Sequence, residues 1–240
     1  MVPTVAFAAT SSPTKVNVKS ATAKSLTYNA KSQTTTIVVN GKTLTLNKDF
    51  KVVSGSLKAT KAGTYTVKIK GIGNYSGDTT VKYTVNAQQS YKATAAAKTY
   101  NAKNQTTKVT VKYGNTVLKR GTDYKITGVT RAKNAGKYKI TVKGINNYKG
   151  TKTIYYTINK AAQKSVKVKV NASKKKITVS GVKAKAKVTY KSANKKVKVK
   201  NGKITVGKGV KKGTKVRITV KVAATKNYKA YSKSIIYKVK

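Results

Sequence analysis

The side chains that most often carry catalysis or hold metal ions are nearly absent from this chain. It has no His, no Cys and no Glu, and its only carboxylate side chains are Asp49, Asp78 and Asp123. Paired-carboxylate hydrolysis, His-activated nucleophiles and His/Cys metal sites all need groups that this inventory lacks. We therefore expect a protein that is not an enzyme, with no cofactor and no metal site.

The charge of the chain is strongly one-sided. It carries 54 Lys and Arg against three acidic residues, a formal net charge of +51 over 240 residues. Only Arg120, Arg131 and Arg217 are guanidinium groups. Arg is preferred where carboxylate or phosphate is held bidentately, whereas Lys acts as a hydrated point charge. This balance predicts either diffuse attraction to an anionic polymer, such as teichoic acid, extracellular DNA or anionic glycans including mucin, or a solvated lysine coat.

Lysines near the end of the chain form short rows in which they alternate with apolar or small residues. In Val166–Val170, this alternation places both lysines on one face of a strand. Such rows bind anionic polymers through counterion release. Their alternative role is to protect strand edges from aggregation, and the two roles are compatible. The residues that we expect to contact a polyanion are Lys167, Lys169, Lys183, Lys185, Lys187, Lys195, Lys196, Lys198 and Lys200.

An internal repeat organises the chain. The segment Thr27–Lys31 (TYNAK) recurs 72 residues later as Thr99–Lys103. The segment Gly71–Gly77 (GIGNYSG) recurs 73 residues later as Gly144–Gly150 (GINNYKG). A nearly constant offset of this kind indicates homologous modules placed in tandem.

The repeat divides the chain into three modules, residues 15–87, residues 88–160, and the divergent residues 161–240, which repeat only the closing half of the pattern. Periodic segments such as Thr66–Lys70 and Lys139–Lys143 alternate with period two and are rich in Val, Ile, Thr and Tyr. Six or seven short strands in each module fit a small β-sandwich. We therefore predict an all-β fold, with three tandem immunoglobulin-like β-sandwich modules in an elongated array.

Residues 1–14 precede the modules and have a different character. Ala6–Ala8 fits the small-x-small pattern of a cleavage site, so we interpret the segment as a signal-peptide remnant or a disordered leader. No later stretch reaches 18 consecutive apolar residues, so we expect no transmembrane segment. The lack of Cys fits an exported protein, and we expect it to be secreted or on a bacterial cell surface.

With the modules aligned, the motifs of the chain are similar to those of a known type. Tyr100–Lys103 (YNAK), Leu118–Tyr124 (LKRGTDY) and Asn134–Gly150 resemble the MBG-like, immunoglobulin-like tandem repeats of exported bacterial surface proteins. The third module, through Val188–Asn194 and Asn201–Val206, resembles the bacterial immunoglobulin-like group 2 pattern. The resemblance implies stalks, spacers or adhesive modules without an active site. This chain departs from it in charge, because typical members hold many more acidic residues.

Asp49 and Asp123 occupy the same position in the first two modules. One interpretation is a structural turn, in which Asp accepts backbone N–H bonds before the strand that starts at Phe50 or Tyr124. The resemblance to surface immunoglobulin-like domains implies a second, in which the carboxylate promotes an isopeptide bond between Lys and Asn side chains. An intact mass lower by one ammonia per module would support the crosslink.

The 16 tyrosines allow two interpretations. Aromatic rings among lysines serve as stacking platforms in single-strand nucleic-acid grooves. However, the pairs Tyr65/Tyr138 and Tyr83/Tyr156 recur at equivalent module positions, in step with the strands. Such recurrence favours packing in the core, with the hydroxyl satisfied at its edge.

Together these features predict a non-enzymatic, exported stalk or adhesive array whose lysine coat is retained on anionic polymers. One alternative is a structural subunit of an extracellular fibre built from copies of itself. Another is an extracellular nucleic-acid binder without sequence specificity, because the scarcity of Arg argues against base reading. Added salt separates these functions, because it weakens electrostatic binding but not a fibre held by strand pairing.

Overall fold

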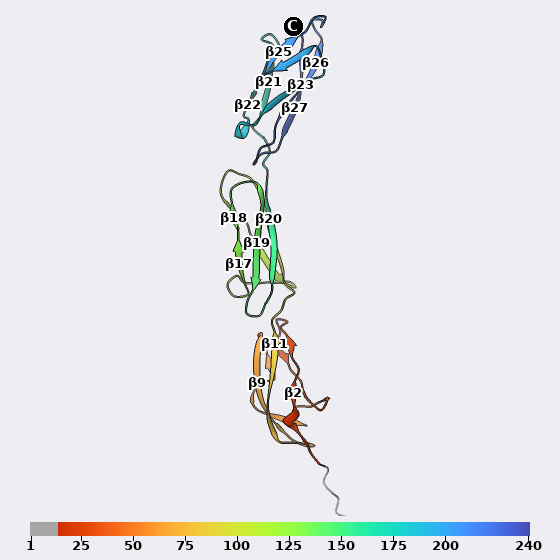
Figure 1. The fold of residues 1–240 in the computed structure, drawn as a ribbon, viewed down its shortest axis with the longest axis vertical. Coiled ribbons are helices and arrows are strands. Elements are labelled where there is room, and N and C mark those ends of the chain that lie inside the picture. Colours follow the sequence, from red (N-terminus) through yellow and green to blue (C-terminus); the bar gives the residue numbers. More distant parts are fainter. Residues whose placement is uncertain (1–13) are drawn as a thin grey trace, which may run out of the picture. The chain divides into compact units, whose positions relative to one another are not determined.

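The computed structural model describes residues 14–240. The predicted leader, residues 1–14, therefore lies outside the described residues except for Thr14. Nearly all regular elements are β-strands, accompanied by two short 3-10 turns (Figure 1). Within the described part, no helix has the length and apolar character needed to cross a bilayer. The predicted fold class, all-β with tandem immunoglobulin-like sandwich modules, is confirmed.

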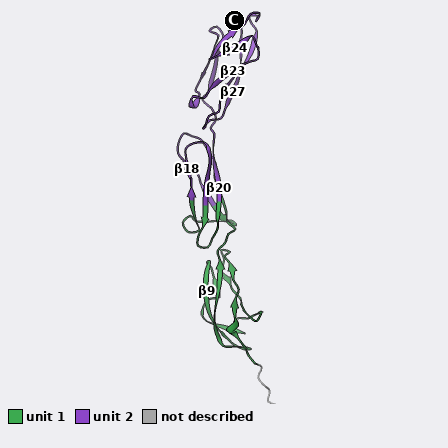
Figure 2. Ribbon diagram, viewed as in Figure 1, with its two compact units in different colours: residues 1–93, 111–126, 142–152 green, residues 94–110, 127–141, 153–240 purple. Residues whose placement is uncertain are grey.

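The chain divides into two compact units (Figure 2). Unit 1 comprises residues 1–93, 111–126 and 142–152, and unit 2 comprises residues 94–110, 127–141 and 153–240. Unit 1 thus contains the first module with part of the second, and unit 2 contains the rest of the second with the third. Each unit includes one junction between consecutive modules.

The first module combines two main sheets with two short strand pairs. Its elements are β1 (Val16–Asn17), η1 (Val18–Ser20), β2 (Thr22–Ala23), β3 (Leu26–Thr27), β4 (Gln33–Thr34), β5 (Ile37–Val39), β6 (Lys42–Thr43), β7 (Phe50–Gly55), β8 (Lys58–Ala59), β9 (Gly63–Gly71), β10 (Tyr75–Ser76) and β11 (Asp78–Asn86). The sheets have the orders β3-β11-β9-β7 and β2-β5-β6, and the pairs are β1-β10 and β4-β8. β9 and β11 pair antiparallel, whereas β3 pairs parallel with the end of β11.

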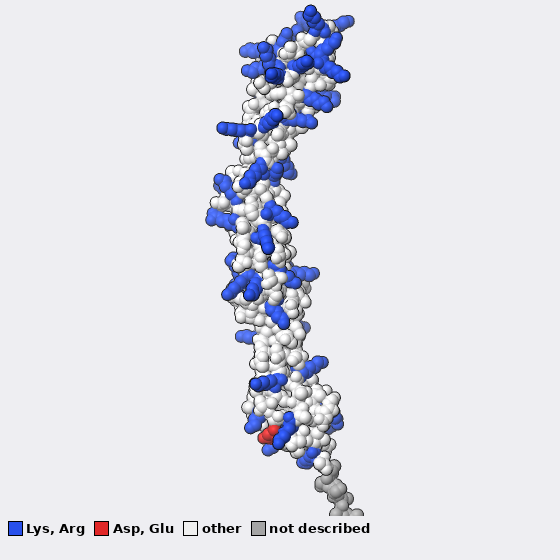
Figure 3. Space-filling view, in the orientation of Figure 1, with Lys and Arg blue, Asp and Glu red and all other residues white. Residues whose placement is uncertain are grey.

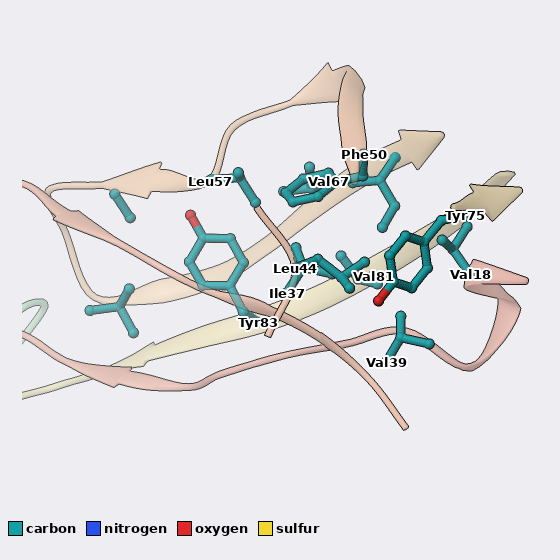
Figure 4. Close-up of a cluster of buried hydrophobic side chains, with 13 residues drawn as sticks. Val18, Ile37, Val39, Leu44, Phe50, Leu57, Val67, Tyr75, Val81 and Tyr83 are labelled. Atoms are coloured by element: carbon teal, nitrogen blue, oxygen red, sulfur yellow. The ribbon is translucent and has the colours of Figure 1, made fainter. Parts of the chain in front are cut away.

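The core of the first module follows from the period-two alternation of its strands. In β9, Val67 and Ile69 are fully buried, and the lysine that follows each of them is exposed. Figure 4 shows the rings of Phe50 and Tyr83 among aliphatic side chains between the strands. The Tyr83 hydroxyl donates a hydrogen bond to the Ser56 carbonyl (3.1 Å), so the ring is buried while its polar end is satisfied.

The second module repeats this strand arrangement. Its elements are β12 (Lys92–Ala95), β13 (Lys98–Thr99), β14 (Gln105–Thr106), β15 (Val109–Tyr113), β16 (Thr116–Val117), β17 (Tyr124–Gly128), β18 (Arg131–Ala132), β19 (Gly136–Gly144) and β20 (Thr151–Asn159). The sheet order β13-β20-β19-β17 matches β3-β11-β9-β7 strand for strand. The parallel pair also recurs, between β13 and the end of β20. The sequence repeat is therefore a repeat of topology.

The third module has a simpler arrangement of two sheets, β21-β22-β25-β24 and β23-β26-β27. Its core contains Ile177, Ile204, Ile218 and Tyr237, each at most 2% exposed. Its elements are β21 (Lys167–Asn171), β22 (Lys176–Ser180), η2 (Lys183–Lys185), β23 (Val188–Ser192), β24 (Val197–Lys200), β25 (Lys203–Val206), β26 (Lys215–Val222) and β27 (Tyr231–Lys238).

In unit 1, the first and second modules meet at a junction of uncharged hydrogen bonds and tyrosine rings. The backbone N–H of Gln88 donates to the Asn147 carbonyl (2.9 Å). The side chain of Asn147 accepts a bond from the backbone N–H of Ala62 in the first module (2.9 Å). The rings of Tyr28 and Tyr148 meet edge to face, with centroids 5.6 Å apart. Backbone, amide and aromatic contacts therefore hold this junction together.

Unit 2 repeats the same junction between the second and third modules. The N–H of Ala161 donates to the Asn227 carbonyl (2.9 Å), and the Asn227 side chain accepts from the N–H of Ala135 (2.8 Å). The rings of Tyr100 and Tyr228 meet edge to face with centroids 5.4 Å apart. Both junctions are thus formed by equivalent residues with nearly equal distances.

The buried tyrosine of the first junction should make stability fall at high pH. Burial, reinforced by the nearby Tyr28 and Asp123, raises the pKa of Tyr148 from 10.0 to about 12. The folded state therefore favours the neutral phenol, and this stabilisation is complete below pH 10.0 and lost as the pH rises through about 12. We expect Tyr148→Phe to lose less stability over this interval than the native chain in urea unfolding. The measurement is made in about 1 M salt, where the Debye length is about 3 Å. At this screening, the loss of lysine charge at high pH changes the repulsion between lysines, and hence the stability, very little.

The matched control for this prediction is Tyr155→Phe, which alters a ring that is 50% exposed. This variant should follow the native pH dependence. Equal curves for Tyr148→Phe and Tyr155→Phe would show that the junction tyrosine does not cause the loss.

Candidate polyanion-binding surface

The outer face of the sheet β21-β22-β25-β24 is formed mainly by lysine and threonine. In β21, Lys167 and Lys169 are exposed, while Val168 between them is 8% exposed. In β22, Lys176 is exposed and the adjacent Ile177 is 2% exposed. The same alternation continues in the other two strands, because one row of each strand must fill the core. The predicted residues Lys167, Lys169, Lys198 and Lys200 all lie on this face.

Strand register places three of the lysines on this face directly opposite one another. Lys176 in β22 pairs with Lys203 in β25, and Lys203 pairs with Lys200 in β24. Directly opposed residues in antiparallel strands have Cβ atoms about 4.5–5.5 Å apart, and like charges at this distance are destabilising. We call Lys176, Lys203 and Lys200 the cross-strand lysine row.

Sequence reasoning missed Lys176 and Lys203. The alternation of Lys176–Ser180 and of Lys203–Val206 is visible in the sequence and predicts that both lysines point outward. The antiparallel register that aligns them with Lys200 depends on which strands become neighbours. Spacing along the chain does not contain that information.

The third module has no acidic side chain to offset these charges. It holds 26 of the 54 basic residues, whereas Asp49, Asp78 and Asp123 all belong to the first two modules. On the face shown in Figure 3, basic side chains are spread over the whole visible surface, and acidic atoms are visible at one place. The positive charge of this module is therefore not compensated by acidic side chains of its own.

Lys183, Lys185 and Lys187 do not form the strand row that their spacing suggests. Lys183 and Lys185 belong to the 3-10 turn η2, and Lys187 follows it just before β23. The chain cannot stay extended here, because Ala184 and Lys185 have positive φ angles of 55° and 48°. All three lysines are exposed, but on a turn rather than on a sheet face.

Lys195 and Lys196 lie in the loop between β23 and β24. The loop begins as a turn in which the Asn194 side chain accepts the backbone N–H of Lys196 (2.9 Å). Lys195 borders an open groove of about 550 Å³ along the two flanking strands. Half-buried Tyr190 also lines this groove, and burial raises the pKa of its hydroxyl. The groove is further bordered by Lys191, Ser192, Asn194, Lys198 and Lys200.

Asp49 and Asp123 each accept a hydrogen bond within a tight turn. The Asp49 carboxylate accepts the backbone N–H of Thr45 (2.8 Å), and the Asp123 carboxylate accepts that of Lys119 (2.8 Å). Both precede a buried aromatic residue, Phe50 or Tyr124, at the start of a strand. These contacts account for the recurrence of the two acids through local structure alone.

Comparison with known proteins leaves the family of the chain open. No family model matches it, and no curated protein does. Among solved structures, extracellular domains 3–5 of Drosophila OTK align with 98% of this chain and 100% of that one, at 9% identity and a TM-score of 0.31. Drosophila N-cadherin EC1-4 aligns with 91% of this chain and 73% of that one, at 11% identity and a TM-score of 0.26. Likenesses this low carry no argument about ligands or function.

The cross-strand lysine row should reduce stability at low ionic strength. Lys203→Thr removes both like-charge pairs of the row, each worth roughly 0.2–1 kcal/mol. We expect the free energy of unfolding to rise at low salt by this order, and the gain to shrink in about 1 M salt, where screening is strong. Urea unfolding at the two salt concentrations measures both values.

The matched control is Lys167→Thr, because Lys167 lies opposite the uncharged Ser180. It removes the same charge from the same face without breaking an opposed pair. A gain as large as that of Lys203→Thr would show that total charge, and not register, sets the repulsion.

Proposed function

We propose that this chain is an exported, non-enzymatic protein of the bacterial cell surface, in which immunoglobulin-like modules act as a stalk or adhesive array. In this proposal its lysine surface retains it on anionic polymers such as teichoic acid, extracellular DNA or acidic glycans. The MBG-like and group 2 motifs support the bacterial origin, and the Ala6–Ala8 pattern supports export. The observation that carries the binding proposal is the cross-strand lysine row, in a module without acidic side chains.

The mechanism follows from the chemistry of the surface. Lysine ammonium groups on flexible stems attract anionic groups without fixing their orientation. Binding releases the condensed counterions of the polymer and relieves the repulsion within the lysine row. Such a surface selects for charge density rather than for a particular sequence or sugar. Retention should therefore be strong at low salt and tolerant of polymer type.

A subunit that assembles end to end into a fibre is the second candidate function. The N–H of Val16 donates to the Asn74 carbonyl (3.0 Å), and Val16 pairs parallel with Tyr75. Gln88 and Tyr148 have this same parallel pairing at the first junction. The first module thus has the backbone contacts of a junction. Asn74 takes the position of Asn147, but its side chain is exposed. A fibre built in this way would persist at high salt, whereas polyanion retention would not.

The lysine row can be tested by the salt dependence of binding. We expect the triple variant Lys176→Thr, Lys200→Thr and Lys203→Thr to lower the slope of log affinity against log salt by about 2–3 on double-stranded DNA, about one for each lost phosphate contact. The same variant should elute earlier from immobilised teichoic acid. Affinity chromatography and titration at several salt concentrations measure both effects.

The control variant removes three exposed lysines from the first module, Lys58→Thr, Lys61→Thr and Lys82→Thr. It has the same net charge as the test variant, and its slope should change by less than about 1. Equal slopes for the two variants would refute a localised surface on the third module. Retention that does not depend on salt would refute electrostatic binding altogether and favour the fibre.

A further inference from the structure

The two module junctions share their hydrogen bonds but are filled differently. In the first junction, Gln88 donates through Nε2 to the Tyr28 carbonyl (3.2 Å) and to the Tyr113 hydroxyl (3.1 Å). The Tyr148 ring meets the rings of Tyr28, Tyr91 and Tyr113, with centroid distances of 5.6, 6.3 and 5.9 Å. Side chains therefore occupy the space beside Tyr148.

The second junction has a smaller residue where the first has Gln88, and an exposed lysine three residues further along the chain. Ala161 takes the position of Gln88. The backbone N–H of each donates to the carbonyl of the junction asparagine, and each forms a parallel bridge with the tyrosine that follows this asparagine. Lys164 follows Ala161 by three residues, as Tyr91 follows Gln88. The result is a pocket of about 370 Å³ within unit 2. It is lined by Tyr100, Tyr228, Ala161, Ala162, Lys164 and Lys183, together with Thr99 and Ser165.

The lining of this pocket combines two kinds of contact. Tyr100 and Tyr228 are half-buried rings that offer apolar surface, and the two alanines leave room beside them. Lys164 and Lys183 add two positive charges at the same pocket. Apolar walls with a few polar groups that fix orientation are typical of small-ligand sites. A ring that bears an anionic group satisfies both kinds of contact.

Gln163 holds the turn that carries Lys183. It lies between the lining residues Ala162 and Lys164 and is only 3% exposed. Its Oε1 accepts the backbone N–H of Lys183 (3.1 Å), which fixes the turn that supplies this lysine. Its Nε2 is buried and has no hydrogen-bond partner within the described chain, but Gln163 is not among the residues that line the pocket.

We propose that this pocket binds one acidic sugar ring of an anionic glycan. The ring lies against Tyr100 and Tyr228, and its carboxylate or sulfate group is held by Lys164 and Lys183. This proposal rests on the proposed function and specifies its ligand, because the lysine surface of the third module retains the rest of the polymer. The pocket becomes the selective contact within otherwise unselective binding.

The dimensions of the site favour a glycan over a nucleic acid. Ligand pockets commonly measure about 300–1,000 Å³, and this one is near the lower limit, so it accepts a single ring. Single-stranded nucleic acids are usually held by successive stacked bases on several aromatic platforms. Here the two rings meet edge to face at 81° and border the same pocket.

The test uses the whole protein and a probe too short to span the lysine surface. Isothermal titration with a uronic acid tetramer in about 0.15 M salt should give one saturable site, and a neutral tetramer should bind at least ten-fold more weakly. Ala161→Gln restores the side chain that fills the first junction, so acidic-tetramer affinity should fall at least ten-fold. Lys164→Thr should also weaken binding, whereas Lys58→Thr, which removes an exposed lysine from the first module, should not. A thermal melt confirms that each variant is folded.

The converse variant tests whether space alone creates the site. Gln88→Ala opens the first junction, but the residue three positions further along is the buried Tyr91 and not a lysine, so this variant should gain no affinity for the acidic tetramer. Native-like binding by Ala161→Gln together with Lys164→Thr, or equal binding of acidic and neutral tetramers, would overturn the proposal. Preference for an oligonucleotide that is lost in Ala161→Gln would identify a nucleic-acid site instead.

Different results would refute the pocket proposal and the proposed function. If the native protein is retained by long polyanions but binds no tetramer, the pocket proposal is wrong and the surface proposal stands. If long polyanions are not retained either, the proposed function is wrong as well.

Discussion

Burial of one row of aliphatic and tyrosine side chains has to overcome the mutual repulsion of the lysines on the opposite row of the same strands. The residues are interleaved, as Val168 is between Lys167 and Lys169, so each strand contributes to both terms. Burying a Val or Ile side chain contributes about 1.5–3 kcal/mol, whereas an opposed lysine pair costs about 0.2–1 kcal/mol. The fold therefore tolerates its charge. A polyanion that neutralised the lysines would remove their repulsion and so raise the free energy of unfolding.

The junctions between modules are governed by a different interaction. Asn147 and Asn227 link modules through neutral amide and backbone bonds, with tyrosine rings beside them. Salt screens exposed charges but has little effect on such contacts. In the proposed function, ionic strength therefore tunes binding to the lysine surface without loosening the connection between neighbouring modules. The proposed binding and the module junctions rely on separate kinds of interaction.

The sequence allowed the fold class and the outward direction of the strand lysines to be predicted, because both follow from period-two alternation. It did not allow the cross-strand lysine row to be predicted, since the opposition of Lys176 and Lys203 depends on which strands pair. Nor did alternation reveal η2, where Lys183 and Lys185 have strand-like spacing but Ala184 has a positive φ. The repeat of Gly71–Gly77 at Gly144–Gly150 shows Tyr148 as part of a recurring motif, yet the role of this tyrosine at a junction depends on contacts with a neighbouring module.

The parallel pairing of β3 with the end of β11, and of β13 with the end of β20, has a mechanical consequence. Tension on a module pulls an early strand and the last strand in opposite directions along the same axis. Parallel neighbours then resist in shear, so that their bonds must break together rather than unzip one by one. In the third module, the first strand β21 pairs antiparallel with β22 instead. Under load, the first two modules should therefore act as stiff links, with their resistance set by a few backbone bonds next to each junction.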